Sequence, residues 1–191
     1  MRTFVALCGI CFISACAYTP MTVSLQPDTT VTVSDIGSGK TVYLWVVDER
    51  DQQDIGHRGA AMMKGARISL EEDLSAVVQS ALSEMLLSKG FEVAYDDTRQ
   101  LNPSLRVDIR NLEYSTSTGF WTGGVEVAAA MKATARGELE TFENFYRFQN
   151  EDRVVVVPGA DSNNERINAA LNDVLHQLMR DRKLLEVLAQ D

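Results

Sequence analysis

The chain has few of the residues that build thiol and metal sites. Of its 191 residues, three are cysteines (Cys8, Cys11 and Cys16) and two are histidines. Because every cysteine lies within the first 16 residues, the rest of the chain has neither a disulfide nor a reactive thiol. No HExxH, GxSxG or GxxxxGK[ST] pattern occurs, which argues against zinc peptidases, serine hydrolases and P-loop enzymes. The sequence therefore indicates no metal and no cofactor.

Long hydrophobic runs are also missing. The apolar stretch Phe4–Ile13 is too short to span a bilayer, which needs about 20 apolar residues. Later in the chain the longest purely aliphatic run is Val154–Val157, which is enough for a strand at most. The formal net charge of −9 argues against nucleic-acid binding and against electrostatic adhesion to anionic lipids.

The first residues predict export and lipid attachment. Residues 1–15 combine a positive charge, an apolar stretch and small residues, the composition of a secretory signal peptide. The sequence Ile13-Ser14-Ala15-Cys16 resembles the lipobox of bacterial lipoproteins. That resemblance implies cleavage before Cys16 and a cysteine that carries diacylglycerol and an N-linked palmitate. Since Ala17 replaces an inner-membrane retention aspartate, we expect an outer-membrane anchor with the protein facing the periplasm.

The remaining chain divides into a linker and one domain. Residues 16–40 are rich in Thr, Ser, Pro and Asp and are predicted to form the lipidated N-terminus and a tether. Two short stretches in this segment alternate as strands do, so part of it is also compatible with packing along the domain. Residues 41–191 are sufficient for a single domain with a hydrophobic core.

Hydrophobic periodicity predicts an α+β fold. Ser69 and Glu72 have capping-box spacing at the start of a helix that ends at Gly90, and a second helix begins at Ser162. Val42–Val47 is predicted to be a strand buried on both faces. Further strands are expected over residues 91–95, 105–114 with a bulge near Asn111, 125–135 and roughly 139–148. The prediction is a two-layer sandwich with a mainly antiparallel sheet of four to six strands and two helices packed on one face.

The order of these motifs resembles a known family. The lipobox is followed by a strand that ends in Asp48-Glu49-Arg50, by Ile55-Gly56 and by a helix that closes at Lys89-Gly90-Phe91. An aromatic-glycine turn and a C-terminal helix complete the pattern. This arrangement is similar to the YajG family of uncharacterised bacterial lipoproteins over nearly the whole mature chain. The family has no established catalytic role, so the resemblance implies a non-enzymatic envelope protein.

Two places are candidates for contact with a ligand or partner. Asp48 and Arg50 stand at a strand end, where sites are often built, but their spacing equally fits a structural ion pair that holds the following loop. Phe120 and Trp121 lie in a glycine-rich turn, where exposed rings would suit docking or a lipid interface. The alternative is that both rings fold back onto the sheet.

The sequence favours a lipid-anchored, non-enzymatic binding or accessory component of the cell envelope. We expect it to contact the membrane through Cys16 and to bind an envelope protein or a cell-wall component. An enzyme that acts on cell-wall material through Asp48 and nearby carboxylates is the alternative from another class. Self-association along an exposed strand edge is a third possibility.

Overall fold

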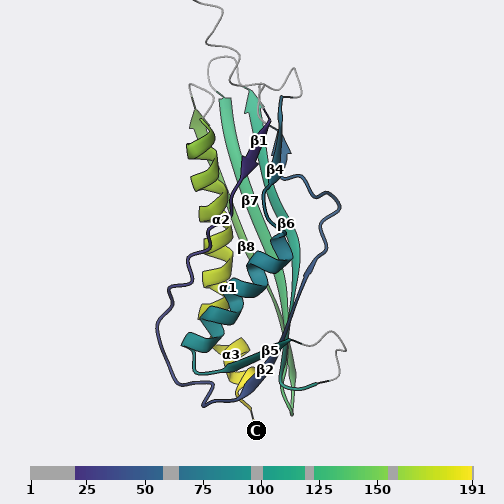
Figure 1. The fold of residues 1–191 in the computed structure, drawn as a ribbon, viewed down its shortest axis with the longest axis vertical. Helices are drawn as coiled ribbons and strands as arrows, with labels where there is room; N and C mark the ends of the chain where they lie inside the picture. Colours follow the sequence, from purple (N-terminus) through teal and green to yellow (C-terminus); the bar gives the residue numbers. More distant parts are fainter. Residues whose placement is uncertain (1–19, 58–64, 96–100, 119–122, 155–158, 191) are drawn as a thin grey trace, which may run out of the picture.

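One mixed sheet covered on a single face by helices forms the body of the protein (Figure 1). The computed structural model describes residues 20–57, 65–95, 101–118, 123–154 and 159–190. Within these ranges the sheet has eight strands and the helices number three. Cys16, Phe120 and Trp121 lie outside the described residues.

The elements follow one another along the chain as strands, a helix, strands and two helices. Their bounds are β1 (Met21–Val23), β2 (Thr41–Asp48), β3 (Gly56–His57), β4 (Arg67–Leu70), α1 (Leu74–Ser88), β5 (Glu92–Tyr95), β6 (Ser104–Thr118), β7 (Gly123–Arg136), β8 (Thr141–Val154), α2 (Ala160–Arg180) and α3 (Arg182–Leu188).

The long strand β6 organises the sheet. Its whole length pairs antiparallel with β7, which in turn pairs antiparallel with β8. On its other side β6 pairs in parallel first with β2 and then, at Tyr114, with β3. β5 pairs in parallel with β2, and the chain reaches it through the crossover helix α1. The predicted α+β class is confirmed, but the sheet is mixed and larger than the mainly antiparallel one of a simple two-layer sandwich, because alternation along a strand does not reveal the direction of its neighbour.

A bulge in β6 changes which residues face the core. The register with β7 shifts between Ile109 and Asn111, as the slip in the apolar pattern predicts. Before the shift Leu105, Val107 and Ile109 are buried, and after it Leu112 and Tyr114 are buried. The extra residue lets one long strand keep an apolar inner face over its full length.

The helices all pack on the inner face of the sheet. α1 contacts β2 and β5, whereas α2 and α3 contact β7 and β8. Near the end of β6, the Tyr114 hydroxyl donates a hydrogen bond of 3.0 Å to the buried Asn163 in the first turn of α2. Packing of helices on one face is confirmed, and Gly90 follows α1 with the predicted left-handed backbone (φ 84°). The α-helical pattern predicted to continue weakly to Leu188 is instead a separate short helix, α3.

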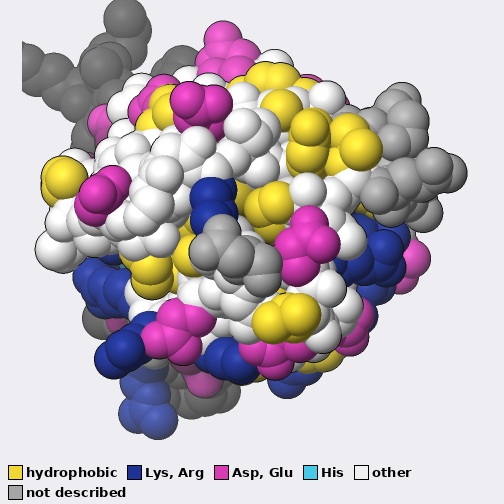
Figure 2. All heavy atoms as spheres, turned by 90° about the horizontal axis from the view of Figure 1, so that it is seen from below, with side chains coloured by type: hydrophobic (Ala, Val, Ile, Leu, Met, Phe, Trp, Pro, Cys, Tyr) yellow, Lys and Arg dark blue, Asp and Glu magenta, His cyan; other side chains and the backbone are white. Residues whose placement is uncertain are grey.

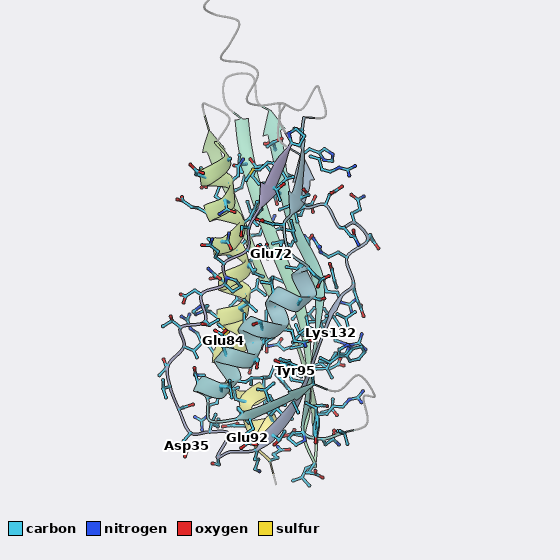
Figure 3. All side chains as sticks on the ribbon, in the orientation of Figure 1. Asp35, Glu72, Glu84, Glu92, Tyr95 and Lys132 are labelled. Carbon is cyan, nitrogen blue, oxygen red and sulfur yellow. The ribbon has the colours of Figure 1, made fainter. Side chains whose placement is uncertain are left out.

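The start of the first helix differs from the prediction. Ser69 belongs to β4, and α1 begins after Asp73, whose carboxylate accepts a hydrogen bond of 2.8 Å from the Ala76 amide. Glu72 is labelled near the upper end of α1 in Figure 3. Its carboxylate accepts hydrogen bonds from the Ser24 hydroxyl (2.9 Å) and from the Leu25 backbone amide (3.1 Å). The prediction of a capping box at Ser69 is wrong, because β4, which contains Ser69, pairs with β1 in the sheet.

The segment that precedes β2 lies along the domain. After β1, the backbone amides of Gln26 and Asp28 donate to Asn168 (2.6 Å) and Asn172 (2.9 Å) of α2. Further on, the Ser34 amide donates to the last residue of α1. Although the sequence analysis assigns residues 16–40 to a tether, the described part from residue 20 onward packs against the helices along the whole length of the molecule (Figure 1).

Side chains cap part of the exposed edge of β8. This strand is continuous over 14 residues, longer than the predicted strand, and among the described strands it pairs only with β7. The Phe145 amide donates to the side chain of Asn144 (2.9 Å), and the Gln177 side chain donates to the Arg147 carbonyl (3.1 Å). A second copy that paired with this edge would have to displace both hydrogen bonds.

Asp181 separates α2 from α3 and fastens the junction to β8. Its carboxylate accepts from the backbone amides of Lys183 (3.0 Å) and Leu184 (3.2 Å). It also accepts from the Tyr146 hydroxyl (2.7 Å) and the Asn144 side chain (2.8 Å). Partial burial alone would raise the pKa of Asp181, but these hydrogen bonds outweigh it and hold the pKa below its ordinary value.

We expect Asp181→Ala to lower the free energy of unfolding by about 2 kcal/mol. The substitution removes the cap of α3, which contributes about 1 kcal/mol, and leaves the buried Tyr146 hydroxyl without its acceptor. Because its pKa is depressed, the stabilisation by Asp181 is present above pH ~4 and is lost as the pH falls further. Urea unfolding against pH measures this. An equal effect of Asp173→Ala, on the exposed side of α2, would contradict the assignment.

Candidate functional site

Asp48 and Arg50 form a tight ion pair at the end of β2. The guanidinium donates from Nε to one carboxylate oxygen of Asp48 (2.9 Å) and from Nη2 to the other (2.8 Å). The Arg50 amide adds a third hydrogen bond of 3.2 Å to the same carboxylate. The Arg50 side chain is only 6% exposed, against 25% for Asp48. The pair thus has the geometry of a structural clamp, as in the interpretation of this motif as an ion pair that holds the following loop.

This geometry leaves Asp48 poorly placed for acid-base chemistry. Both of its oxygens already bind the guanidinium, so a substrate would have to displace a bidentate pair. Within the described ranges, no group of three or more His, Cys, Asp or Glu side chains is arranged to hold a metal ion.

A different surface has the features of a binding site. On β2, Val42, Leu44 and Val46 are buried beneath the helices, whereas Tyr43 and Trp45 point to the opposite face and are only partly buried. The prediction that this strand is buried on both faces is therefore wrong. The reason is that no second layer of described residues covers the outer face of the sheet.

The strand registers arrange the outward side chains in three rows, here called the open face. Each row crosses the sheet from β2 to β8. The rows are Tyr43, Ser104, Arg136 and Thr141; Trp45, Arg106, Thr134 and Glu143; and Val47, Asp108, Lys132 and Phe145.

Aromatic rings and cations lie against one another on this open face. The guanidinium carbon of Arg106 lies 4.7 Å from the centroid of the Trp45 ring. The ring of Phe145, which is 52% exposed, has Lys132 at 6.0 Å and Arg147 at 5.5 Å. Cations this close to a ring face are attracted by its quadrupole, which holds both groups in place. The open face therefore offers apolar area and positive charge together.

Acidic neighbours hold most of these cations, but not all of them. Arg106 contacts both the buried Asp108 and Glu49, and Lys132 lies 2.9 Å from Glu143. Hydrogen bonds from Lys132, and also from the neighbouring threonine, keep the pKa of Glu143 below its ordinary value. Arg136 is exposed and forms no ion pair with any described residue, although its charge also helps to lower the pKa of Glu143. Together with the exposed Arg147 beside the Phe145 ring, it is a cation on this surface that is available to an external anion.

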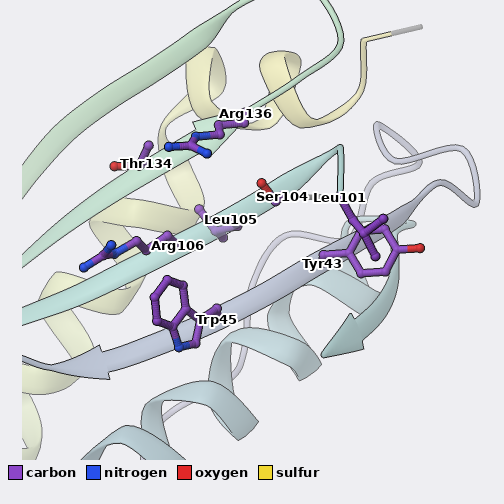
Figure 4. Close-up of a pocket in the computed structure, with 8 residues that line it drawn as sticks. All are labelled: Tyr43, Trp45, Leu101, Ser104, Leu105, Arg106, Thr134 and Arg136. Carbon is purple, nitrogen blue, oxygen red and sulfur yellow. The ribbon is translucent and has the colours of Figure 1, made fainter. Parts of the chain in front are cut away.

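A small pocket opens beside Arg136 (Figure 4). Its volume is about 110 Å³, well below the roughly 300–1,000 Å³ of typical small-molecule sites. Tyr43 and Trp45 of β2, with Leu101, line one side, and Thr134 and Arg136 of β7 line the other. Ser104, Leu105 and Arg106 of β6 lie between them. The pocket is large enough for one side chain of a partner, which fits a docking surface better than a site for a multi-ring substrate.

Sequence reasoning missed this surface for an identifiable reason. Trp45 and Tyr43 belong to a run of apolar residues, which is read most simply as a strand with two buried faces. The available signal was in the other strands, where arginine or lysine alternates with buried residues at Arg106, Lys132 and Arg136. Only the registers show that these side chains share a face with the two rings.

We expect Asp48→Ala to lower the free energy of unfolding by about 3 kcal/mol, because it removes the bidentate partner of the buried Arg50 guanidinium. Asp51→Ala is the matched control, because Asp51 is exposed and lies three residues later. The control should change stability by no more than about 0.5 kcal/mol. Urea denaturation monitored by circular dichroism gives both values. Similar small losses in the two variants would show that the pair does not act as a clamp.

Three solved structures are similar to this chain over most of its length. A Xanthomonas campestris protein of the DUF330 family has a TM-score of 0.50 at 11% identity, with 90% of this chain and 95% of that chain covered. An uncharacterized protein has a TM-score of 0.49 at 9% identity, with coverage of 85% and 99%. A Helicobacter pylori protein described as a homolog of neuraminyllactose-binding hemagglutinin has a TM-score of 0.47 at 12% identity, with coverage of 86% and 96%. At these identities the first likeness shows the fold alone.

Comparison with protein families gives the assignment. No curated protein matches the chain. None of the helices in the described ranges has the length and apolar character needed to cross a bilayer. A family model described as an uncharacterized lipoprotein matches residues 27–189, which is nearly the whole chain. The chain therefore belongs to the YajG family of uncharacterized lipoproteins of the cell envelope, as its sequence motifs predict.

Proposed function

We propose that this lipoprotein is a non-catalytic envelope component that binds an acidic protein partner on its open face. The observation that carries the proposal is the uncovered outer face of the sheet, where Tyr43, Trp45 and Phe145 lie among basic side chains. Lipid on Cys16 would hold the protein to a membrane, and Ala17 favours the outer membrane with the domain in the periplasm.

The charge on this surface points to an acidic partner. The whole chain has a net charge of −9, whereas basic side chains slightly outnumber acidic ones in the three rows of the open face. The basic residues of these rows are Arg106, Lys132 and Arg136, and the acidic residues are Asp108 and Glu143. Arginine and aromatic side chains together are typical of the energetic centres of protein interfaces.

The form of the pocket supports a protein partner. A carboxylate side chain entering it would meet Arg136, while the rings of Tyr43 and Trp45 would contact the apolar part of the same residue. Arg106 is already neutralised by Asp108 and Glu49, so it supplies a flat, fixed surface rather than a free charge. Rings and guanidinium groups held in this way lose little conformational entropy on binding.

An enzyme that acts on cell-wall material is the second candidate. Its proposed acid or base, Asp48, lies at a strand end where catalytic groups are common. The bidentate contact with Arg50 counts against it, because the carboxylate must exchange a strong partner for each proton transfer. We therefore place binding ahead of catalysis.

A site-specific photo-crosslinker tests the binding surface in the native envelope. Benzoylphenylalanine at position 145 should form a discrete crosslinked product, whereas the same group at position 87 should not. Phe145 and Leu87 make a matched pair, since they are 52% and 55% exposed and lie on the open face and on a helix. Purified products are identified by mass spectrometry.

Charge reversal supplies the second arm of this test. Arg136→Glu should abolish the product at position 145, because it replaces the available cation of the pocket by an anion. Arg182→Glu is the control, since that arginine is 88% exposed at the start of α3 and makes the same change in net charge. Crosslinks of equal yield from positions 145 and 87, or a product unaffected by Arg136→Glu, would contradict the proposed surface.

A further inference from the structure

The two ends of the molecule differ in their distance from the predicted lipid anchor. At one end, called here the β6–β7 end, β6 stops at Thr118, β7 starts at Gly123 and α2 starts at Ala160. At the opposite end, called here the pocket end, lie Tyr43 and Arg136 of the pocket (Figure 4). Figure 1 shows the β6–β7 end at the top, and Figure 2 looks directly onto the pocket end from below.

The chain enters the fold at the β6–β7 end. Met21 is paired with Ile68 in the sheet and is 6% exposed. The side-chain amide of Asn163, in the first turn of α2, lies 4.0 Å from the Met21 sulfur. From there β1 runs parallel to β4 and antiparallel to β3 and β6, so it leads away from this end. The path of the polypeptide is therefore fixed from Met21 onward.

The covalent chain between anchor and fold is short. Met21 is five residues after Cys16, and five residues span at most about 17 Å when fully extended. In contrast, the 14 residues of β7 extend over about 43 Å from the β6–β7 end to the pocket end. A lipid on Cys16 thus keeps the β6–β7 end close to the bilayer but leaves the pocket end free to stand well beyond it.

The net charge of the domain favours an upright orientation on the membrane over a flat one. The chain has a net charge of −9, and bacterial envelope membranes contain anionic lipids that repel such a body at short range. Lying flat on a helix-covered side would bring acidic surface to the lipid, and lying on the open face would cover the proposed partner surface. Standing upright brings only one end to the lipid, so it limits the repulsion and keeps the open face accessible.

We infer that the β6–β7 end faces the lipid surface and that the domain holds the pocket roughly 40 Å away from it, toward a partner outside the anchoring membrane. This inference rests on the proposed lipidation of Cys16. It adds to the proposed function that the partner approaches from the aqueous side or from an opposing structure. A partner embedded in the same bilayer would reach only the β6–β7 end.

Fluorescence quenching in vesicles tests the orientation. Processing removes Cys8 and Cys11 and acylation blocks Cys16, so an introduced cysteine is the single reactive thiol. Bimane is attached to the Ser117→Cys or the Leu139→Cys variant of the full lipidated protein. Ser117 is exposed at the β6–β7 end, and Leu139 is 80% exposed in the turn at the pocket end. The vesicles contain phosphatidylcholine, phosphatidylglycerol and a headgroup-labelled nitroxide lipid.

We expect severalfold stronger quenching at position 117 than at position 139, where the fluorescence should match that of the same labelled protein on vesicles without the nitroxide lipid. Quenching at position 139 equal to or greater than that at position 117 would overturn the orientation. Flotation of the protein with the vesicles distinguishes a failure of the proposed lipidation from a failure of the proposed orientation. Failure of the lipidated form to float would overturn the lipidation and the orientation together, whereas flotation with strong quenching at position 139 would overturn the orientation alone.

Discussion

The structure depends on one long strand that two different sets of neighbours share. Along one side β6 pairs with β7 from end to end, and along the other it pairs first with β2 and then with β3. Every one of these strands must fit the twist and register of β6. The bulge between Ile109 and Asn111 makes this possible, because it restores the inward direction of Leu112 and Tyr114 after the pattern slips.

The same alternation that builds the core also builds the candidate binding surface. Each inward residue of β6 and β7 is followed by an outward one, so the burial of Leu105 and Ala135 beneath the helices places Arg106 and Thr134 on the other side. Three helices cover the inner face in the described part of the chain, and the outer face remains open to solvent. Substitutions of the outward side chains can therefore alter the binding surface with little effect on packing between the sheet and the helices.

Much of this architecture can be read from local patterns in the sequence. Helices, the left-handed Gly90 and the bulge near Asn111 depend on short-range spacing, and the family assignment depends on the order of motifs along the chain; all are confirmed. The errors share one cause, which is pairing between distant segments. Ser69 was assigned to a helix because its spacing to Glu72 fits a cap, but β1 recruits it into the sheet and Glu72 binds the segment around Ser24 instead.

The candidate site was harder to predict for the same reason. Asp48 and Arg50 are two residues apart, so their ion pair follows from the strand alone. Trp45, Arg106 and Arg136 are distributed over nearly one hundred residues and meet only when the parallel register of β2 with β6 is known. Spacing along the chain contains no information on that register. Once the three strands are aligned, the outward side chains are seen to share one polar face.

Occupancy of the pocket in the native envelope tests the central claim most directly. A Ser104→Cys variant places a thiol in the pocket, and a Ser80→Cys variant places one at an exposed position of α1. The rate of alkylation by a maleimide is measured for each variant in intact envelopes and divided by its rate in the purified protein. A ratio severalfold lower for the pocket variant is the predicted result, since a bound partner shields the open face. Equal ratios for the two variants would contradict it.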